Sequence, residues 1–438
     1  MIKHSAQNKT GPAPDPIGDP ADLMLDRIRF AGFCVALIGA AFSISLASIG
    51  SVMYVLAWVA AALRRSLKKS RDFQASDPPR LPYFPLLAVL IAGLAVSIAI
   101  NGFPSESRQG VLKYAWSFLL LYAGMDVLRG RKRWMGVAAL ILVCEGAAAA
   151  SGIGQDFFGK DFINGRPPVL YTAAITRITG PFKHCNDFAT FLIPGWLFGA
   201  SLVIDRFRRR KVWPAAAGMV FLALIGWAMF RTVSRSAMIG AGAGTLVLAF
   251  MLPYRRRMLL ALAAGAAAAW WLPSTLSVRL HQLTDFGGVL RERVYLIKGA
   301  LKMIHQSPWF GLGPNTYSKW FPVFNPPDPS APVLMYTHNS FLQIATETGW
   351  IGLGLYVAYV VAVQVRSALL LNEPGAEEIR WIRAAALASV LAILVNALFE
   401  SLLQSTQLRT LFWCLIGISA AAYGRRDAGS AEKGKKRS

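Results

Sequence analysis

A histidine lies where a long, proline-rich segment turns into an apolar helix. Residues 336–354 read YTHNSFLQIATETGWIGLG, which places a polar cluster, residues 337–340, directly before the apolar run. The imidazole of His338 can remove a proton from a hydroxyl group at neutral pH. Asn339 could orient the ring or cap the helix. The cluster therefore indicates either a general base at a membrane surface or a histidine that is only a polar residue at a helix start.

A buried carboxylate and a basic segment accompany this cluster. Glu347 lies about two helical turns beyond His338, where an ionised group needs a partner. Arg177 and Lys183 precede Asn186 at the start of another apolar run. The free amides of a helix N-terminus favour an anion, and the two basic side chains add full charges. We expect a diphosphate there, with the alternative that Asn186 only caps its helix.

Two further arginines lie in a very short connection between apolar runs. Arg231 and Arg235 must both lie at or just below the membrane boundary, because only residues 231–236 separate the two runs. A guanidinium group is always charged and binds phosphate through two hydrogen bonds. The alternatives are that these side chains reach lipid headgroups, or pair with a buried acid such as Glu347 or Glu400.

The composition is that of an integral membrane protein. The chain has 438 residues, of which 55% are hydrophobic and 16% charged, and its mean hydropathy is +0.43. The net charge of +23 arises from short basic clusters between apolar runs, which argues against nucleic-acid binding by a basic face. The four cysteines are scattered singly and indicate neither a disulfide framework nor a metal site.

Apolar runs predict about twelve membrane-spanning helices. They cover residues 30–47, 49–63, 81–100, 111–128, 134–151, 187–204, 212–230, 236–252, 258–272, 340–365, 381–403 and 406–423. Most of the 46 lysines and arginines fall on one side if the N-terminus is cytoplasmic, as the positive-inside rule requires. We therefore predict an all-α integral membrane protein with both termini in the cytoplasm and the histidine cluster outside.

The chain divides into two tails and one membrane domain. Residues 1–26 and 425–438 are expected to be a disordered and a basic cytoplasmic tail, without a cleavable signal sequence. Residues 27–424 form the membrane domain, whose large periplasmic loop is residues 273–339. Within this loop a helix is expected to lie on the outer membrane surface. Its apolar stripe consists of Val294, Ile297, Leu301 and Ile304.

Motifs in the second half resemble the O-antigen ligase and O-antigen polymerase superfamily. His338-Asn339, followed after nine residues by Gly349-x-x-Gly352, is similar to the H-[NSQ]-x9-G-x-x-G motif of that superfamily. Three more segments resemble its other landmarks in the same order. They are RITGPFKHCN at 177–186, SRS at 234–236 and the P-x-x-G-x-G turn at 308–313.

This resemblance implies a helical bundle that transfers a glycan from undecaprenyl diphosphate to an acceptor, without a metal or nucleotide cofactor. The implied general base is His338. The arginines expected to hold the diphosphate are Arg177, Arg231 or Arg235, and Arg291 or Arg293. The supporting residues are Asn186, Asn339 and Glu347. Arginines placed before the reaction would stabilise the departing diphosphate, and a single displacement would invert the anomeric centre.

Several functions remain open at this stage. Ligation of O-antigen to lipid A-core is the first hypothesis, and a polymerase that extends O-antigen or an exopolysaccharide would use the same residues. A protein O-oligosaccharyltransferase is a weaker alternative. A transporter or flippase would require polar or broken helices near the bilayer midplane. Every glycan-transfer hypothesis places the site on the periplasmic side of a bacterial inner membrane, and requires His338, Arg177 and Arg235 to converge on one cavity.

Overall fold

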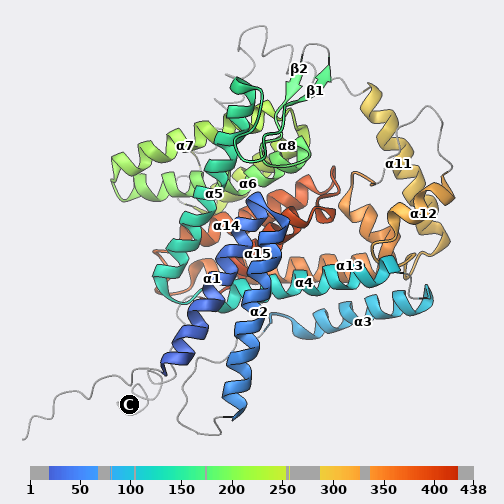
Figure 1. Ribbon diagram of the computed structural model, residues 1–438, viewed down its shortest axis with the longest axis horizontal. Helices are drawn as coiled ribbons and strands as arrows, with labels where there is room; N and C mark the ends of the chain where they lie inside the picture. Colours follow the sequence, from blue (N-terminus) through green and yellow to red (C-terminus); the bar gives the residue numbers. More distant parts are fainter. Residues whose placement is uncertain are drawn as a thin grey trace, which may run out of the picture.

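The computed structural model describes residues 19–67, 79, 81–102, 105–172, 175–252, 256, 287–325 and 336–422. Within them the chain forms helices and one small antiparallel β-hairpin (Figure 1). The first elements are α1 (Pro20–Phe42), α2 (Ile44–Leu67), α3 (Phe84–Ile100), α4 (Ser105–Val127), α5 (Gly130–Phe158), β1 (Val169–Thr172) and β2 (Ile175–Arg177). The next are α6 (Cys185–Arg208), α7 (Val212–Arg231), α8 (Arg235–Met251), α11 (Gly287–Gln306) and α12 (Tyr317–Phe324). The last are α13 (Ser340–Leu369), η1 (Leu370–Asn372), α14 (Arg380–Asn396), η2 (Leu402–Gln404) and α15 (Thr406–Ala420).

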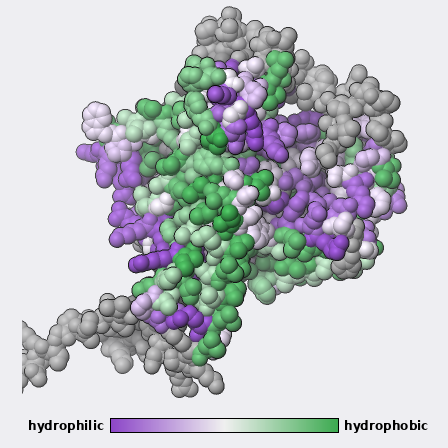
Figure 2. All heavy atoms as spheres, viewed as in Figure 1, coloured by the Kyte–Doolittle hydropathy of each residue, from purple (hydrophilic) through white to green (hydrophobic). Residues whose placement is uncertain are grey.

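Within the described residues, five helical segments are long and apolar enough to cross a membrane: α2, α5, α6, α7 and the segment formed by α13 and η1. On the face shown in Figure 2, hydrophobic residues form a broad central band with hydrophilic residues on either side. The chain is therefore a predominantly helical membrane protein, as its composition predicts. Every predicted apolar run coincides with a helix except residues 258–272, which lie outside the described residues. Twelve spans and a periplasmic loop remain predictions.

The N-terminal helix begins inside the segment that we expected to be a tail. Helix α1 starts at Pro20, and the side chain of Asp19 accepts a hydrogen bond of 3.0 Å from the amide of Ala21. An aspartate before a proline at the first helical position is a favourable helix start. Residues 1–18 and the expected C-terminal tail at 425–438 lie outside the described residues.

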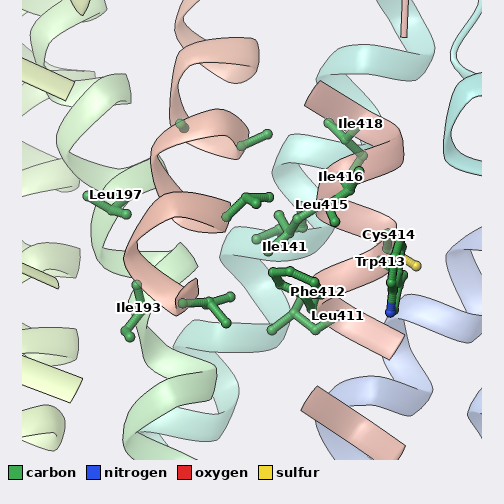
Figure 3. Close-up of a cluster of buried hydrophobic side chains, with 14 of the residues drawn as sticks. Ile141, Ile193, Leu197, Leu411, Phe412, Trp413, Cys414, Leu415, Ile416 and Ile418 are labelled. Carbon is green, nitrogen blue, oxygen red and sulfur yellow. The ribbon is translucent and has the colours of Figure 1, made fainter. Parts of the chain in front are cut away.

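The hydrophobic core is built around α14 and α15. Helix α14 packs against α6, α8 and α15, and nearly all of its side chains are buried. In Figure 3, Ile141 of α5 lies beside the α15 segment that contains Leu411 and Leu415. A helix that is apolar on all sides is expected to lie inside a bundle. This packing fixes the ends of α6, α8 and α14, which carry most of the polar residues described below.

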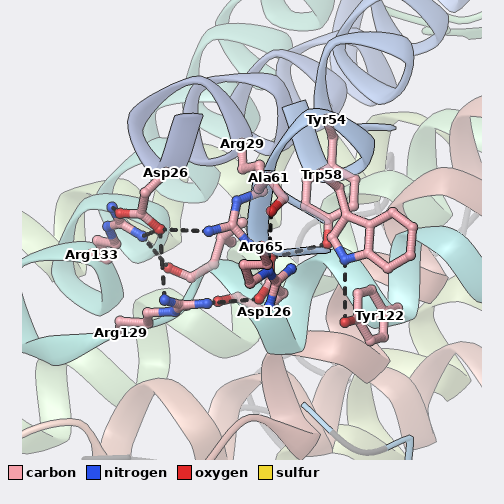
Figure 4. Close-up of polar contacts among 11 residues, drawn as sticks. Asp26, Arg29, Tyr54, Trp58, Ala61, Arg65, Tyr122, Asp126, Arg129 and Arg133 are labelled. Atoms are coloured by element: carbon pink, nitrogen blue, oxygen red, sulfur yellow. Dashed lines mark hydrogen bonds and ion pairs between the residues drawn. The ribbon is translucent and has the colours of Figure 1, made fainter. Parts of the chain in front are cut away.

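A buried ion network joins the first helices at the C-terminal end of α4 (Figure 4). The Asp126 carboxylate is 1% exposed and accepts hydrogen bonds from Arg29 at 2.6 Å and from Arg129 at 2.8 Å. Arg133 pairs with Asp26 of α1. Because a buried carboxylate without a partner is costly, these contacts tie α1, α4 and α5 together. Part of the basic cluster predicted to face the cytoplasm is therefore neutralised within the bundle.

Helix α11 has two apolar faces. Sequence analysis predicted one of them, the stripe that includes Val294, Ile297 and Leu301. Three of the four predicted stripe residues are exposed: Val294 by 40%, Ile297 by 38% and Leu301 by 48%. The buried face consists instead of Leu296, Ala300, Met303 and Ile304, of which Leu296 and Met303 cluster with Tyr317 and Phe321 of α12. Burial raises the pKa of the Tyr317 hydroxyl. The short helix α12 was not predicted, and it covers the face opposite the exposed stripe.

Helix α13 is broken at Gly349, where the turn at 308–313 crosses it. Gly349 has φ +70° and ψ −178°, so the helical hydrogen bonds are interrupted at this residue. The turn replaces them: the amide of Leu312 donates to the carbonyl of Thr346 at 3.0 Å, and the amide of Trp350 donates to the carbonyl of Pro308 at 2.8 Å. The break at Gly349 therefore joins two sequence motifs through their backbones.

Replacing Gly349 with alanine is expected to lower the stability of the protein by roughly 2 kcal/mol or more. An added Cβ atom would lie 2.2 Å from backbone atoms of Trp309, and φ is in the left-handed region. Gly354→Ala is a matched control, because it lies in the same helix and its Cβ would meet no atom within 4 Å. Thermal unfolding in detergent measures the difference. Equal Tm values for the two variants would contradict this account of the helix break.

Candidate functional site

His338 is held directly before the first turn of α13. The side chain of Asn339 caps this helix by accepting hydrogen bonds of 3.0 Å from the amides of Phe341 and Leu342. His338 itself has φ +49°, a conformation that is uncommon for a residue other than glycine. The Thr337 hydroxyl stabilises it by accepting the amide of Asn339 at 3.0 Å. Backbone strain of this kind is concentrated at functional sites.

A buried carboxylate orients the imidazole. The Nδ1 atom of His338 lies 3.0 Å from Oε2 of Glu400. The histidine side chain is 41% exposed, whereas that of Glu400 is 8% exposed. An ionised carboxylate can only accept a hydrogen bond, so Nδ1 carries the proton and the lone pair of Nε2 is left available. This arrangement suits a general base whose tautomer is fixed by a third group.

Glu400 reaches this position because α14 ends earlier than predicted. The predicted run extends to residue 403, but the helix ends at Asn396, whose side-chain amide donates to Thr190 at 2.6 Å. The chain then turns, and Ser340 binds the turn by donating its amide to Ala397 and its hydroxyl, at 2.7 Å, to the carbonyl of Glu400. Sequence analysis named Glu400 only as an alternative partner for arginines. An acid inside an apolar run was the signal that could have singled it out.

A continuous network links Glu400 to two arginines. The side chain of Asn186 donates to Oε1 of Glu400 at 2.8 Å and accepts a hydrogen bond of 2.7 Å from Arg177. Arg293 of α11 lies 3.6 Å from the same carboxylate oxygen. Asn186 therefore connects charged groups and does not act as a helix cap. Arg177 is held in place by a further hydrogen bond of 2.6 Å to the carbonyl of Thr232.

The arginines and the histidine line one cleft of about 530 Å³. Arg177 comes from β2, Arg235 from the first turn of α8 and Arg293 from α11, and all three share the wall of this cleft with His338. We call it the arginine cleft. The rest of its wall combines apolar residues with polar ones. The apolar residues are Val233, Ile239, Val294, Leu296, Ile297, Leu398 and Phe399, and the polar ones include Ser234, Ser236 and Thr337. The convergence that glycan transfer requires is therefore present.

The matched family model covers the residues that form much of this cleft. Residues 219–357 match the model described as O-Antigen ligase, and this segment includes Arg235, Arg293 and His338. This match supports the O-antigen ligase and polymerase superfamily. No curated protein matches the chain. The motifs at 234–236, 308–313 and 338–352 lie inside the matched segment, and the motif at 177–186 lies outside it. A glycan-transferring membrane enzyme is the activity that the superfamily implies.

Some residues expected to act in this superfamily site lie elsewhere. Arg231 pairs with Asp156 at the end of α5, and it is not among the described residues that line the arginine cleft. The side chain of Arg291 lies outside the described residues. Glu347 is 4% exposed and pairs with no arginine among its described hydrogen bonds, accepting instead from the amide of Asn315 at 2.7 Å.

A second cleft lies on the other side of the histidine. It has a volume of about 790 Å³ and shares Asn186, His338 and Glu400 with the arginine cleft. The rest of its wall is mainly polar and charged, and includes Asn164, Arg166, Lys183, His184, Asp187, Gln404 and Gln407. Phe42 and Ile44 form an apolar corner where α1 meets α2. The imidazole thus stands between two openings, where it can contact groups that arrive from either one.

Glu400→Gln is expected to lower kcat for glycan transfer roughly 100-fold or more. The glutamine amide can donate to Nδ1, which would move the proton of the imidazole to Nε2 and remove the basic lone pair. The KM for the lipid-linked donor should change less than kcat, because all three arginines remain and only Arg293 loses a charged partner. Glu400→Asp keeps the charge and should restore part of the activity. A Glu400→Gln variant with wild-type kcat would show that this carboxylate does not position the base.

Proposed function

We propose that this superfamily member transfers a glycan from undecaprenyl diphosphate to a hydroxyl group of lipid A-core, as an O-antigen ligase. The observation that carries the proposal is the placement of His338, oriented by Glu400, between an arginine-lined cleft and a second cleft. We place this site on the periplasmic side of a bacterial inner membrane, in keeping with the distribution of basic residues.

The arginine cleft suits the lipid-linked donor. Three guanidinium groups gather near His338, and guanidinium groups bind phosphate oxygens through paired hydrogen bonds. The apolar wall continues along Ile239 of α8 and Ile297 of α11, which are 53% and 38% exposed. A polyprenyl diphosphate has the matching structure, since a doubly charged head is joined to a long hydrocarbon tail.

The acceptor is proposed to reach His338 through the second cleft. Nε2 takes the proton of the acceptor hydroxyl as its oxygen attacks the anomeric carbon of the donor sugar. The new C–O bond forms while the bond from that carbon to the diphosphate oxygen breaks, and the electron pair leaves with the diphosphate. Nucleophile and leaving group lie on opposite sides of the carbon, so the anomeric configuration is inverted.

In this scheme, positively charged side chains that face the departing diphosphate lower the barrier to transfer. Positioned donors that face developing negative charge lower the barrier most strongly in a site that excludes water. The guanidinium groups of Arg177, Arg235 and Arg293 are already in place before the bond breaks, partly because Asn186 and Glu400 hold two of them. The proposal assigns no step to a metal ion, and the reaction is driven by the activated donor.

Two acceptors distinguish the ligase from a polymerase. The protein in lipid vesicles is given an undecaprenyl diphosphate-linked glycan, either with lipid A-core or with a second lipid-linked glycan. A ligase attaches the glycan to lipid A-core, whereas a polymerase lengthens the glycan on the lipid carrier. A flippase moves the donor across the bilayer without consuming it. Donor that is unchanged with both acceptors would overturn the proposal of glycan transfer.

A further inference from the structure

Two cationic side chains line the second cleft and are not among the residues that line the arginine cleft. They are Arg166, in the loop between α5 and β1, and Lys183, directly before α6. Sequence analysis expected Lys183 to bind a diphosphate together with Arg177. The structure places Arg177 on the wall of the arginine cleft and Lys183 on the wall of the second cleft. Lys183 therefore lies on the side of His338 that we assign to the acceptor.

A buried carboxylate shapes the loop that carries Arg166. Asp161 is 2% exposed, and its side chain accepts hydrogen bonds from three amides of its own loop. The donors are Ile163 at 2.9 Å, Asn164 at 2.6 Å and Arg166 at 2.6 Å. The amide of Asp161 in turn donates to the carbonyl of Arg166 at 2.9 Å. These hydrogen bonds fix the backbone of the loop at the point where Arg166 leaves it.

A buried glutamine joins this loop to the segment that precedes α6. The side-chain nitrogen of Gln155 donates to the carbonyls of Arg166 at 3.0 Å and Pro167 at 2.9 Å. Its side-chain oxygen accepts the amide of Thr179 at 2.7 Å. Gln155 is 0% exposed, and a buried amide is tolerated when both of its ends are satisfied. The two loops are therefore held together from below by one side chain.

The carbonyl of Pro181 brings the two basic positions close together. It accepts hydrogen bonds from Nη1 of Arg166 at 3.1 Å and from the side-chain amide of Asn164 at 2.9 Å. Lys183 lies two positions further along the chain. Arg166 is half-buried and Lys183 is exposed. The hydrogen bond to Pro181 uses one of the five donors of the guanidinium group, so others can bind a second acceptor atom.

The acids of the second cleft interact with other groups. Glu400 is paired with His338, and Asp187 interacts with His184 and Ser405. Within the described part of the chain, neither of the two cations forms an ion pair with a carboxylate. The cleft thus has an acidic region around the base and a basic region on the two joined loops. A ligand that carries a hydroxyl group and, at some distance from it, a negative charge would match both regions.

We propose that Arg166 and Lys183 bind an oxyanion of the acceptor, a phosphate or carboxylate group on the sugars of lipid A-core. The inference rests on the proposed function and adds a recognition site to it. A guanidinium group and an ammonium group together suit such an anion. Binding it on a rigid pair of loops would hold the acceptor so that its hydroxyl group meets His338. An acceptor without the anion is still a substrate, but it binds more weakly.

The first test uses the wild-type protein in vesicles with three forms of lipid A-core. One form is untreated, one is treated with phosphatase that is then removed, and one has its carboxylates converted to amides. Because Lys183 is exposed and partly screened by water, loss of the recognised group should raise the acceptor KM about 10-fold. The treated form that shows this rise identifies phosphate or carboxylate as the ligand. Equal acceptor KM values for all three forms would overturn the inference.

The second test combines altered protein with altered acceptor. Arg166→Gln and Lys183→Gln should each raise the KM for untreated acceptor roughly 3- to 10-fold, and neither should change the KM for the form that lacks the anion. The donor KM should stay at the wild-type value. Lys160→Gln is the matched control, because Lys160 is an exposed lysine of the same loop that does not line the second cleft.

Three results of the second test would contradict the inference. An equal rise with both acceptors would show that the two cations only support the fold of the loops. A rise in donor KM in place of acceptor KM would assign them to the diphosphate. An effect of Lys160→Gln as large as that of Lys183→Gln would show that only the general charge of the surface matters.

The two proposals fail in different ways. If no form of lipid A-core receives glycan, the proposed function fails and the acceptor site fails with it. If all forms receive glycan with the same KM, only the oxyanion site fails. The comparison of acceptors on the wild-type protein also decides the matter if a variant does not fold.

Discussion

His338→Ala is expected to lower the rate of glycan transfer by about 10²- to 10⁴-fold. The variant lacks the only imidazole that lines both clefts and is oriented by a buried carboxylate among the described residues. Without a base, the acceptor hydroxyl must attack while still protonated. The measurement is single-turnover consumption of lipid-linked donor, in vesicles that contain a saturating acceptor.

A second histidine provides the control for this variant. His305 lies in the last turn of α11, is exposed and does not line either cleft. His305→Ala should retain wild-type transfer, and both variants should keep the wild-type Tm, because the His338 side chain is itself partly exposed. Transfer by His338→Ala at the rate of His305→Ala would remove His338 from the mechanism.

Arg235→Ala is expected to lower kcat by about 10²- to 10³-fold. Arg235 lies in the first turn of α8 on the wall of the arginine cleft, where the diphosphate leaving group is proposed to gain charge. Arg235→Lys keeps the charge but loses the two-pronged geometry, so its kcat should be intermediate. Rates measured with purified donor at saturation separate this effect from donor binding.

The matched control for Arg235 is a cation outside the cleft. Lys302 is an exposed residue of α11 that does not line the arginine cleft, so Lys302→Ala should change kcat little. Arg231 gives a further contrast, because its pairing with Asp156 joins the ends of α5 and α7. Loss of Arg231 is expected to lower Tm more than kcat. Equal kcat values for Arg235→Ala and Lys302→Ala would contradict the proposed role.

Local signals in the sequence predicted most of the described helices and named several residues that line the arginine cleft. Long apolar runs are unambiguous, because a bilayer selects helices of a given length. Motif spacing singled out His338 and Arg177 and left the choice between Arg231 and Arg235 open. In the structure, His338, Arg177 and Arg235 line one cleft. The same signals missed the hairpin of β1 and β2, the short helix α12 and the break at Gly349. The break depends on hydrogen bonds to the turn at 308–313, which lies far away in the sequence.

The sequence did not predict which side chains the arginines and the buried acids would contact. Arg231 and Arg235 are equally good phosphate ligands in the sequence. Only the fold pairs the first with Asp156 and places the second in the same cleft as His338. Glu347 and Glu400 are likewise both acids in apolar runs. The end of α14 at Asn396 brings Glu400 beside the imidazole, while Glu347 lies in a different cavity.

The sequence by itself determined the class of this protein and the chemical groups available to it. Apolar length and residue types are properties of short segments, so a membrane bundle with a histidine and several arginines follows from them directly. Only the tertiary structure decided which guanidinium groups share a cleft with His338, which carboxylate orients it and that two clefts meet there. These are distances between helices far apart in the chain, and they depend on where each helix ends and packs.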